Sequence, residues 1–329
     1  MKAVFMTSGI KKIDEVYTES TRKELAKKLE FLEPVTSLDQ LSRPDLAGVE
    51  VIFSTWGMLS PTKEQIAEFL PNLKAVFYGA GSVQYFARPF IESGIEVFSA
   101  WAANAVPVAE YTVAQIILAN KGYFQRFHHI PGKAWERSSG GYFTGNFGNK
   151  VGLIGIGMIG KLVASMLKIY QLEILAFDPF LPDEKAAELG IRKVSLETLF
   201  SECTVISNHL ANNPQTVGML NGKLFDLMKP NATFINTGRG AQVVEDELIA
   251  ALEAEPARVA LLDVTMPEPP KPDSKFYTLP NVFLSPHIAG SLGDEVARMG
   301  DYMAEEFGRW ENGEATKWGV TLKMLETMA

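Results

Sequence analysis

Cysteine is almost missing from this chain. Its 329 residues include one, Cys203, so no internal disulfide can form and the disulfide frameworks of small secreted proteins are excluded. Cys203 lies at a predicted step from a helix to a strand, residues 201–205, where a small buried side chain is more typical than a nucleophile. The chain starts with a strand-like segment followed by acidic residues, which is not the pattern of a signal peptide.

Long uncharged apolar runs and clusters of basic residues are lacking as well. No such run reaches the roughly 18 residues that a membrane-spanning helix needs. The formal net charge is −8, and no stretch concentrates Lys or Arg, so we expect neither nucleic acid nor a membrane as a partner. We therefore expect a soluble protein of the cytoplasm.

What the sequence does contain is a regular alternation of short apolar runs with longer amphipathic segments. This alternation predicts parallel sheets covered by helices on both faces. A first series of predicted strands comprises Lys2–Met6, Val49–Ser54, Leu73–Tyr78, Ile95–Ser99 and a weaker one at Leu32–Val35. A second series of six comprises Lys150–Ile156, Leu172–Asp178, Thr204–Leu210, Thr233–Thr237, Val259–Val264 and Val282–Pro286. Six such strands complete a dinucleotide-binding sheet.

The predicted helices suggest how the two series are combined. They include Glu19–Leu29, Pro61–Phe69, Phe86–Ser93, an apolar helix at Val106–Ala119 between the series, and a helical tail at Gly293–Gly313. A helix that follows the last strand can return to the first domain. We predict an α/β protein in which a Rossmann dinucleotide-binding domain, residues 104–290, is inserted into a smaller flavodoxin-like substrate domain formed by residues 1–103 and 291–329.

A glycine-rich turn leads from the first strand of the second series into a helix. In this G-x-G-x-x-G motif, Gly155 permits the tight turn, Gly157 lets the backbone approach a pyrophosphate, and Gly160 allows close packing of helix and strand. The positive end of the helix, 158–170, would face the phosphates. Asp178 follows about 20 residues later, where a carboxylate accepts the ribose hydroxyls and repels a 2′-phosphate. The motif predicts NAD rather than NADP, although Asp178 alone would also fit a turn before Pro179.

Three polar residues follow the later strands, at the edge where open α/β sheets bind ligands. Arg239 lies between two glycines, and its planar guanidinium can donate to two oxygens of a 2-oxo carboxylate. Glu268 lies between two prolines, and His287 directly follows the last predicted strand. Reduction of a ketone needs a proton donor, and histidine paired with a carboxylate suits that task near neutral pH. Taken singly each residue could be an ordinary loop residue, but together they indicate one site.

The sequence resembles the D-isomer-specific 2-hydroxyacid dehydrogenase family over about residues 70 to 310. The matching segments, in the order of the family, are 155–160, Asp178, 236–240, 262–264 with Glu268, and 286–288. The resemblance implies that Arg239 binds the substrate carboxylate and carbonyl, and that His287 is the general acid/base paired with Glu268. The implied cofactor-binding residues are Gly155, Gly157, Met158, Ile159, Gly160, Asp178, His209, Thr237, Asp263, which would meet the nicotinamide carboxamide, and Gly290.

On the substrate side, the resemblance implies backbone contacts from an early glycine loop, here Ala80, Gly81 and Ser82. This loop continues with Gln84-Tyr85-Phe86 instead of the family's polar pair, and segment 101–105 also departs from the common form. These departures affect the identity of the substrate more than the type of reaction. Two residues of an earlier strand-end loop, Trp56 and Met58, either contact the substrate's side chain or pack between domains.

The implied function is an NAD-dependent oxidoreductase that interconverts a small 2-keto acid and the D-2-hydroxy acid. An alternative on the same fold is an NAD-sensing protein similar to transcriptional corepressors, because fold alone does not give function. The apolar helix at 106–119 resembles the family's dimer contact and predicts a homodimer. His128 and His129 lie in an irregular arm without Cys or acidic partners at ligand spacing, so we predict no metal site.

Overall fold

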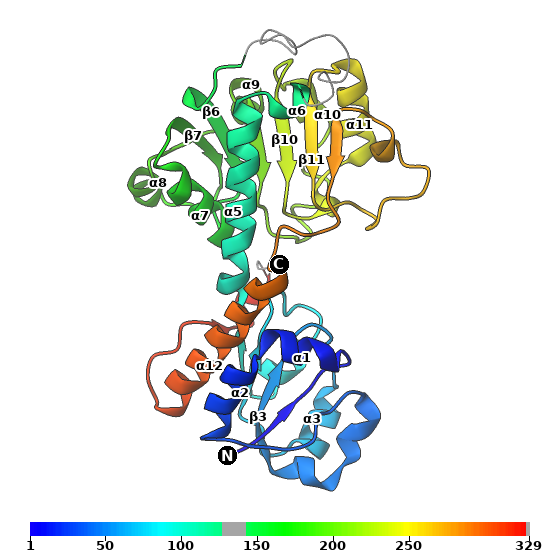
Figure 1. The fold of residues 1–329 in the computed structure, drawn as a ribbon, viewed down its shortest axis with the longest axis vertical. Coiled ribbons are helices and arrows are strands. Elements are labelled where there is room, and N and C mark those ends of the chain that lie inside the picture. The colour runs from blue at the N-terminus through cyan, green and yellow to red at the C-terminus, as the bar shows by residue number, and fades with distance from the viewer. Residues whose placement is uncertain (127–142, 327–329) are drawn as a thin grey trace. The chain divides into compact units, whose positions relative to one another are not determined.

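The computed structural model describes residues 1–126 and 143–326 (Figure 1). The chain divides into two compact units: unit 1 comprises Met1–Asn104 and Ser291–Ala329, and unit 2 comprises Ala105–Gly290. Unit 2 is therefore inserted between two parts of unit 1, and its first residue lies one position after the predicted boundary. His128 and His129 of the predicted arm lie outside the described residues.

Unit 1 is built on a mainly parallel sheet in the order β13-β5-β4-β3-β1-β2, in which β13 is antiparallel to β5. The first five strands thus have the order 2-1-3-4-5 that characterises flavodoxin-like folds. The strands are β1 (Lys2–Phe5), β2 (Glu30–Phe31), β3 (Val49–Ser54), β4 (Ala75–Tyr78), β5 (Glu96–Ser99) and β13 (Gly319–Val320). The helices are α1 (Ile10–Val16), α2 (Glu19–Ala26), η1 (Leu38–Ser42), η2 (Pro44–Gly48), α3 (Lys63–Phe69), α4 (Ala87–Glu92), η6 (Gly293–Val296), α12 (Ala297–Glu311) and η7 (Met324–Glu326).

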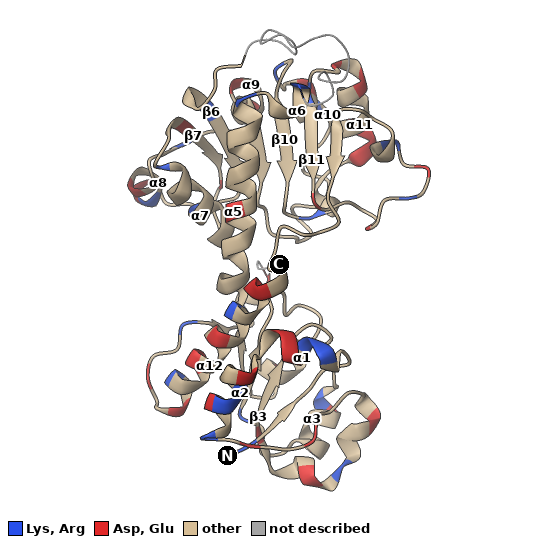
Figure 2. Cartoon of the chain, viewed as in Figure 1, with Lys and Arg blue, Asp and Glu red and all other residues tan. Residues whose placement is uncertain are grey.

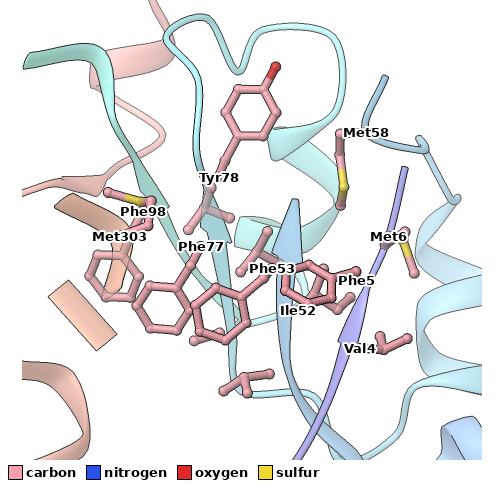
Figure 3. Packing of buried hydrophobic residues seen from close by; sticks show 14 of the residues in the cluster. Val4, Phe5, Met6, Ile52, Phe53, Met58, Phe77, Tyr78, Phe98 and Met303 are labelled. Atoms are coloured by element: carbon pink, nitrogen blue, oxygen red, sulfur yellow. The ribbon is translucent and has the colours of Figure 1, made fainter. Parts of the chain in front are cut away.

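The core of unit 1 is a row of aromatic rings across three neighbouring strands. Phe53, Phe77 and Phe98 are register partners on β3, β4 and β5, and their rings stack at centroid distances of 5.2 and 4.9 Å (Figure 3). Phe307 of α12 contacts the Phe53 and Phe77 rings edge-on. Buried aromatic pairs of this kind add to the stabilisation that their apolar area gives, so α12 is fixed onto the sheet from the far end of the chain.

Unit 2 is a parallel sheet in the order β12-β11-β10-β9-β6-β7-β8. The strands are β6 (Phe147–Ile154), β7 (Gln171–Phe177), β8 (Ile191–Lys193), β9 (Val205–Asn208), β10 (Thr233–Asn236), β11 (Val259–Leu262) and β12 (Val282–Leu284). The helices are α5 (Trp101–Asn120), of which residues 101–104 belong to unit 1, α6 (Tyr123–Arg126), α7 (Met158–Leu167), α8 (Asp183–Leu189), α9 (Leu196–Glu202), α10 (Gly222–Asp226), η4 (Gly240–Gln242), α11 (Glu245–Ala254) and η5 (Lys275–Tyr277). The order β8-β7-β6-β9-β10-β11 is the Rossmann order, with β12 added at its edge.

Two layers of helices cover the sheet of unit 2. Helices α5, α7 and α8 pack on one face, whereas α9, α10 and α11 pack on the other. Charged residues lie mainly on the helices and loops and are fewer on the strands (Figure 2). Cys203 is fully buried between α9 and β9, as predicted. Burial raises the pKa of its thiol to about 12, so the thiol is a poor nucleophile.

Several sequence predictions need correction. The sheet of unit 2 has seven strands in the described residues rather than six, because β8 was missed: it has three residues, of which Arg192 and Lys193 are charged. The weak strand predicted at 32–35 was misplaced. The strand β2 lies at Glu30–Phe31, and Val35 forms only an isolated bridge with Met6.

Helix α5 also differs from its prediction, since it begins at Trp101 instead of Val106 and therefore carries Pro107 in its interior instead of in its first turn. In the described part of the chain, α5 alone is long and apolar enough to cross a membrane by length and composition, and half of its apolar window is buried in the fold. Most of α5 is a core helix of unit 2, because Ala109, Ile116 and Ala119 lie in the hydrophobic cluster between the sheet and the helices α5, α7 and α8.

The packing of α12 on α1 gives a test of the fold of unit 1. A Cβ atom at Gly300 would lie 2.0 Å from the backbone oxygen of Val16, whereas a Cβ at Gly308 of the same helix would meet nothing within 4 Å. We expect Gly300→Ala to lower the free energy of unfolding by about 1–3 kcal/mol, because the helix must shift. Gly308→Ala, the matched control, should stabilise by up to about 1 kcal/mol through helix propensity. Urea unfolding measures both, and equal effects would contradict this packing.

Candidate functional site

The glycine-rich turn joins β6 to α7 at the carboxyl edge of the sheet of unit 2. Gly155 has a φ of +87°, which favours glycine. A Cβ on Gly160 would lie 2.2 Å from the Gly155 oxygen, so helix and turn touch here. A Cβ on Gly157 would meet nothing within 4 Å. The turn is therefore tight at its first and third glycines and open at its second, as a phosphate-binding turn requires.

Asp178 lies against this turn at the end of β7. Its Oδ2 accepts a hydrogen bond of 2.7 Å from the backbone N–H of Ile156, and its Oδ1 accepts one of 2.8 Å from that of Phe180. Helix α7 has Gly157 as its N-cap and no side-chain cap, so the N–H groups of its first turn, which includes Met158 and Ile159, remain for an anion. These residues fit the pyrophosphate and ribose of a dinucleotide.

His209 lies beside the turn, at the end of β9. Its backbone oxygen would be 2.9 Å from a Cβ on Gly155. The ring is buried, with Nε2 3.0 Å from the Ser207 hydroxyl and Nδ1 without a hydrogen-bond partner among the described residues. Burial lowers the pKa of His209 to about 4, so the ring is neutral at physiological pH. A buried polar atom without a partner at this place also fits a bound ligand.

A buried amide network that sequence reasoning missed supports the Arg239 loop. The Gln242 carbonyl accepts from the Asn208 side chain at 2.6 Å and from the Arg239 N–H at 3.1 Å, and its amide donates to the Leu210 oxygen. Asn236 accepts from Asn208 and from the Gly238 N–H. Amides at the ends of two adjacent apolar strands were the available signal. The network ties the Arg239 loop to the loop that carries His209.

Arg239 and Glu268 are brought together by close backbone packing. A Cβ on Gly240 would lie 2.0 Å from the carbonyl carbon of Thr265, so the two loops touch here. Burial lowers the pKa of Arg239, and the charge of Glu268 acts in the opposite direction. The Arg239 guanidinium donates to the backbone oxygen of the preceding residue, Gly238, at 2.7 Å. Thr237, before this loop, is buried with its hydroxyl 3.3 Å from that of Thr112 on α5.

His287 and Glu268 form the central pair of the site. The Nδ1 atom of His287 lies 2.6 Å from Oε1 of Glu268, and both side chains are partly exposed, at 46% and 42%. Because Nδ1 is used in this contact, Nε2 is the nitrogen left for proton transfer. The backbone φ of His287 is +53°, a value uncommon outside glycine. The predicted Arg239, Glu268 and His287 therefore come together at the ends of β10, β11 and β12.

Asp263 is buried at the end of β11 and holds the loop that carries His287. Its carboxylate accepts hydrogen bonds from the Ile288 and Ala289 N–H groups, each 2.9 Å, and from the Ser285 hydroxyl at 2.6 Å. Its backbone oxygen accepts from the His287 N–H. The resemblance suggested only a contact with nicotinamide for Asp263, and the structure adds this organisation of the loop, which ends at Gly290.

The predicted substrate loop lies in unit 1. The hydroxyl of Ser99 donates to the oxygens of Ala80 and Gly81. The Ala80 N–H already donates to the Tyr78 oxygen, which leaves the N–H groups of Gly81 and Ser82 as candidate donors to an anion. In the strand-end loop, Met58 is buried in the core of unit 1, whereas Trp56 is 36% exposed. Among residues 1–126 and 143–326, no cluster of three metal-ligating side chains was found.

Comparison with known proteins identifies unit 2. Residues 113–289 match the family model of the D-isomer specific 2-hydroxyacid dehydrogenase, NAD binding domain. The chain belongs to the D-isomer specific 2-hydroxyacid dehydrogenase family. Its cofactor is NAD, in agreement with the predicted motif and with the geometry of the glycine-rich turn.

Two relatives within this family are named D-3-phosphoglycerate dehydrogenase. D-3-phosphoglycerate dehydrogenase of Archaeoglobus fulgidus is 32% identical over 265 residues, which are 80% of this chain and 50% of that protein. D-3-phosphoglycerate dehydrogenase of Mycobacterium tuberculosis is 33% identical over a stretch that covers 64% of this chain and 40% of that protein. It thus spans half or less of the length of these curated relatives.

Solved structures share the fold. A phosphoglycerate oxidoreductase from Rhizobium etli has a TM-score of 0.82 at 22% identity, covering 99% of both chains. The NAD-complexed D-isomer specific 2-hydroxyacid dehydrogenase from Lactobacillus delbrueckii ssp. bulgaricus has a TM-score of 0.79 at 20% identity, covering 98% of this chain and 100% of that one. At these identities the likeness concerns the fold, and it confirms the predicted α/β class with a Rossmann domain.

Two glycines of the NAD turn allow binding and stability to be separated. We expect Gly157→Ala to weaken NADH binding about tenfold or more without lowering the melting temperature, because its Cβ enters open space where the pyrophosphate would approach. Gly160→Ala should lower the melting temperature, since its Cβ would meet the Gly155 backbone. Titration of protein fluorescence with NADH and thermal unfolding measure the two effects. Normal NADH affinity in Gly157→Ala would contradict the assignment of the turn.

Proposed function

We propose that this chain is an NAD-dependent oxidoreductase that interconverts a small 2-keto acid and the D-2-hydroxy acid (EC 1.1.1.-). The observation that carries the proposal is the 2.6 Å contact between His287 and Glu268, on loops that follow adjacent strands of the NAD-binding sheet. Such a pair next to a guanidinium provides an acid/base group and an anion-binding group in one place. Family membership and the cofactor support the same reaction class.

Each residue of the trio has a distinct proposed role. Arg239 would bind the substrate carboxylate through its planar fork and polarise the adjacent carbonyl. The nicotinamide, when bound, supplies or accepts the hydride. During reduction, Nε2 of His287 would donate a proton to the oxygen that gains charge, and Glu268 would stabilise and orient the imidazolium through Nδ1. The desolvation of Arg239 strengthens its attraction for a carboxylate.

Cofactor contacts are proposed for the residues predicted from the sequence. Gly155, Gly157, Met158, Ile159 and Gly160 would bind the pyrophosphate. Asp178 would accept the ribose hydroxyls and disfavour the 2′-phosphate of NADP. The proposed contacts farther along the edge are His209, Thr237, Asp263 and Gly290. For the substrate, we propose Arg239 together with backbone groups of the loop Ala80, Gly81 and Ser82.

The assembly and location of the protein are part of the same proposal. Leu118 of α5 and Tyr123 of α6 are large and exposed, at 42% and 44%, which supports this region as a homodimer contact. Light scattering should then give twice the 36.2 kDa mass of the chain. We place the protein in the cytoplasm, which is consistent with one buried, free thiol, Cys203.

The proposed reaction is tested by NADH oxidation with a panel of 2-keto acids and by His287→Gln. We expect His287→Gln to lower kcat by about 10²–10⁴-fold, because the proton donor is removed. The NADH dissociation constant should change less than about twofold, since the exposed imidazole is not part of the glycine turn. Stopped-flow absorbance at the NADH band and fluorescence titration measure the two quantities.

The same experiment separates the enzyme from an NAD-sensing binding protein. If the wild type turns over a keto acid and His287→Gln does so at the same rate, the proposed role of the imidazole is rejected. NADH binding with no turnover on any acid of the panel would reject the enzyme and favour the corepressor-like alternative. Glu268→Gln provides an intermediate variant, because it keeps a hydrogen-bonding partner for Nδ1 but removes the charge that stabilises the imidazolium.

A further inference from the structure

A chain of side-chain hydrogen bonds runs from helix α5 to the loop that carries His287. The Tyr111 hydroxyl on α5 lies 2.8 Å from the hydroxyl of Ser285, and the latter lies 2.6 Å from Oδ1 of Asp263. None of the sequence motifs includes Tyr111 or Ser285. All three residues belong to unit 2, so the chain is internal to the NAD-binding domain.

The direction of these hydrogen bonds follows from the protons available. An ionised carboxylate only accepts, so the single hydroxyl proton of Ser285 is donated to Asp263. The Ser285 oxygen is then an acceptor, and Tyr111 must donate to it. Burial raises the pKa of Tyr111, the hydrogen bond with Ser285 acts in the opposite direction, and the charge of Asp263 adds to the effect of burial. The pKa is raised on balance, so the phenol keeps the proton that it donates. Both hydroxyls therefore have a fixed orientation toward Asp263.

Asp263 transmits this orientation to the backbone around His287. Its Oδ1 accepts from Ser285 and from the Ile288 N–H, whereas its Oδ2 accepts from the Ala289 N–H. The two N–H groups are those of the residues that follow His287, whose φ of +53° requires support from its surroundings. Without the Ser285 hydroxyl, Oδ1 would keep one partner, and rotation of the carboxylate would loosen both backbone contacts.

We propose that Tyr111 and Ser285 are positioning residues that lock the Asp263 carboxylate and thereby hold the His287 loop in the conformation required for proton transfer. Neither residue is assigned a contact with substrate or cofactor. The effect on turnover rests on the proposed function, whereas the effect on the loop can be measured in the protein without cofactor or substrate. The proposed effect on the loop and the proposed effect on turnover can therefore be rejected independently.

The test uses three variants of the full chain and a matched control. Tyr111→Phe and Ser285→Ala each remove one hydroxyl and little volume, and the double variant removes both. Tyr277→Phe is the control, because its hydroxyl donates to the Pro270 oxygen at 3.2 Å in an exposed part of the same unit. Hydrogen–deuterium exchange of a peptide spanning 285–290 reports on the Ile288 and Ala289 amides in the cofactor-free protein. Steady-state kinetics give kcat and KM with the keto acid found by the panel.

We expect about five- to tenfold faster exchange of these amides in Tyr111→Phe and in Ser285→Ala, as for the loss of one hydrogen bond in a network that includes a charge. The Tyr277→Phe control should not change. In the double variant the effect should equal that of the stronger single variant, because both hydroxyls act through one chain. The value of kcat should fall by a similar factor, while KM for the keto acid changes less than about twofold.

Three results would overturn the inference: exchange as slow as in the wild type in Tyr111→Phe, effects that multiply in the double variant, or faster exchange with unaltered kcat in an active enzyme. The third result would mean that the conformation of the loop does not govern proton transfer. If the wild type turns over no 2-keto acid, the proposed function fails, and the exchange measurements alone decide whether the two hydroxyls hold the loop.

Discussion

The proposed active site depends on the hydrogen bonds that the carboxylate of Asp263 accepts. It is buried at the end of β11 and accepts three hydrogen bonds from the loop that follows β12. A buried carboxylate is retained only where such donors compensate its desolvation. Here the donors belong to the residues around His287, so the need to satisfy one charge also determines the backbone of the proposed acid–base histidine.

Parallel strand order explains how three groups far apart in the chain reach one place. Arg239, Glu268 and His287 follow β10, β11 and β12, which are neighbours in the sheet and end at the same edge. The register brings the loops together, and Gly240 removes the side chain that would separate them. The buried amides of Asn208, Asn236 and Gln242 then fix the Arg239 loop, and the Asp263 carboxylate fixes the His287 loop. The loops of Arg239 and His287 are thus each supported by hydrogen-bonded, buried polar groups.

The sequence was informative where a local pattern carries its own physical requirement. The glycine turn needs small residues at fixed positions, and the structure places Gly155 at positive φ and Gly160 against the turn. The pairing of Glu268 with His287 could be anticipated because both follow predicted strands and their chemistry is complementary. The strand β8 escaped detection because three residues, two of them charged, give no apolar period.

Contacts that depend on register and side-chain direction could not be obtained in this way. Tyr111 lies in an apolar helix whose sequence favours packing, and its hydroxyl contact with Ser285 spans 174 positions. Gln242 follows the Arg239 motif as an ordinary turn residue, yet it is fully buried and binds Asn208 and Leu210 on either side of His209. Such polar groups become meaningful only when the sheet has placed their partners, since an amide alone fits a surface turn equally well.

Family membership bears unequally on the two units. The matching family model spans residues 113–289, which lie in unit 2, so it supports the NAD cofactor but does not reach the loops of unit 1. Relatives named D-3-phosphoglycerate dehydrogenase act on a phosphorylated acid, and phosphate recognition usually relies on Arg or Lys. Neither residue type occurs in segments 56–59 or 79–86 of this chain. These two loops of unit 1 therefore supply no cationic side chain to a phosphate group.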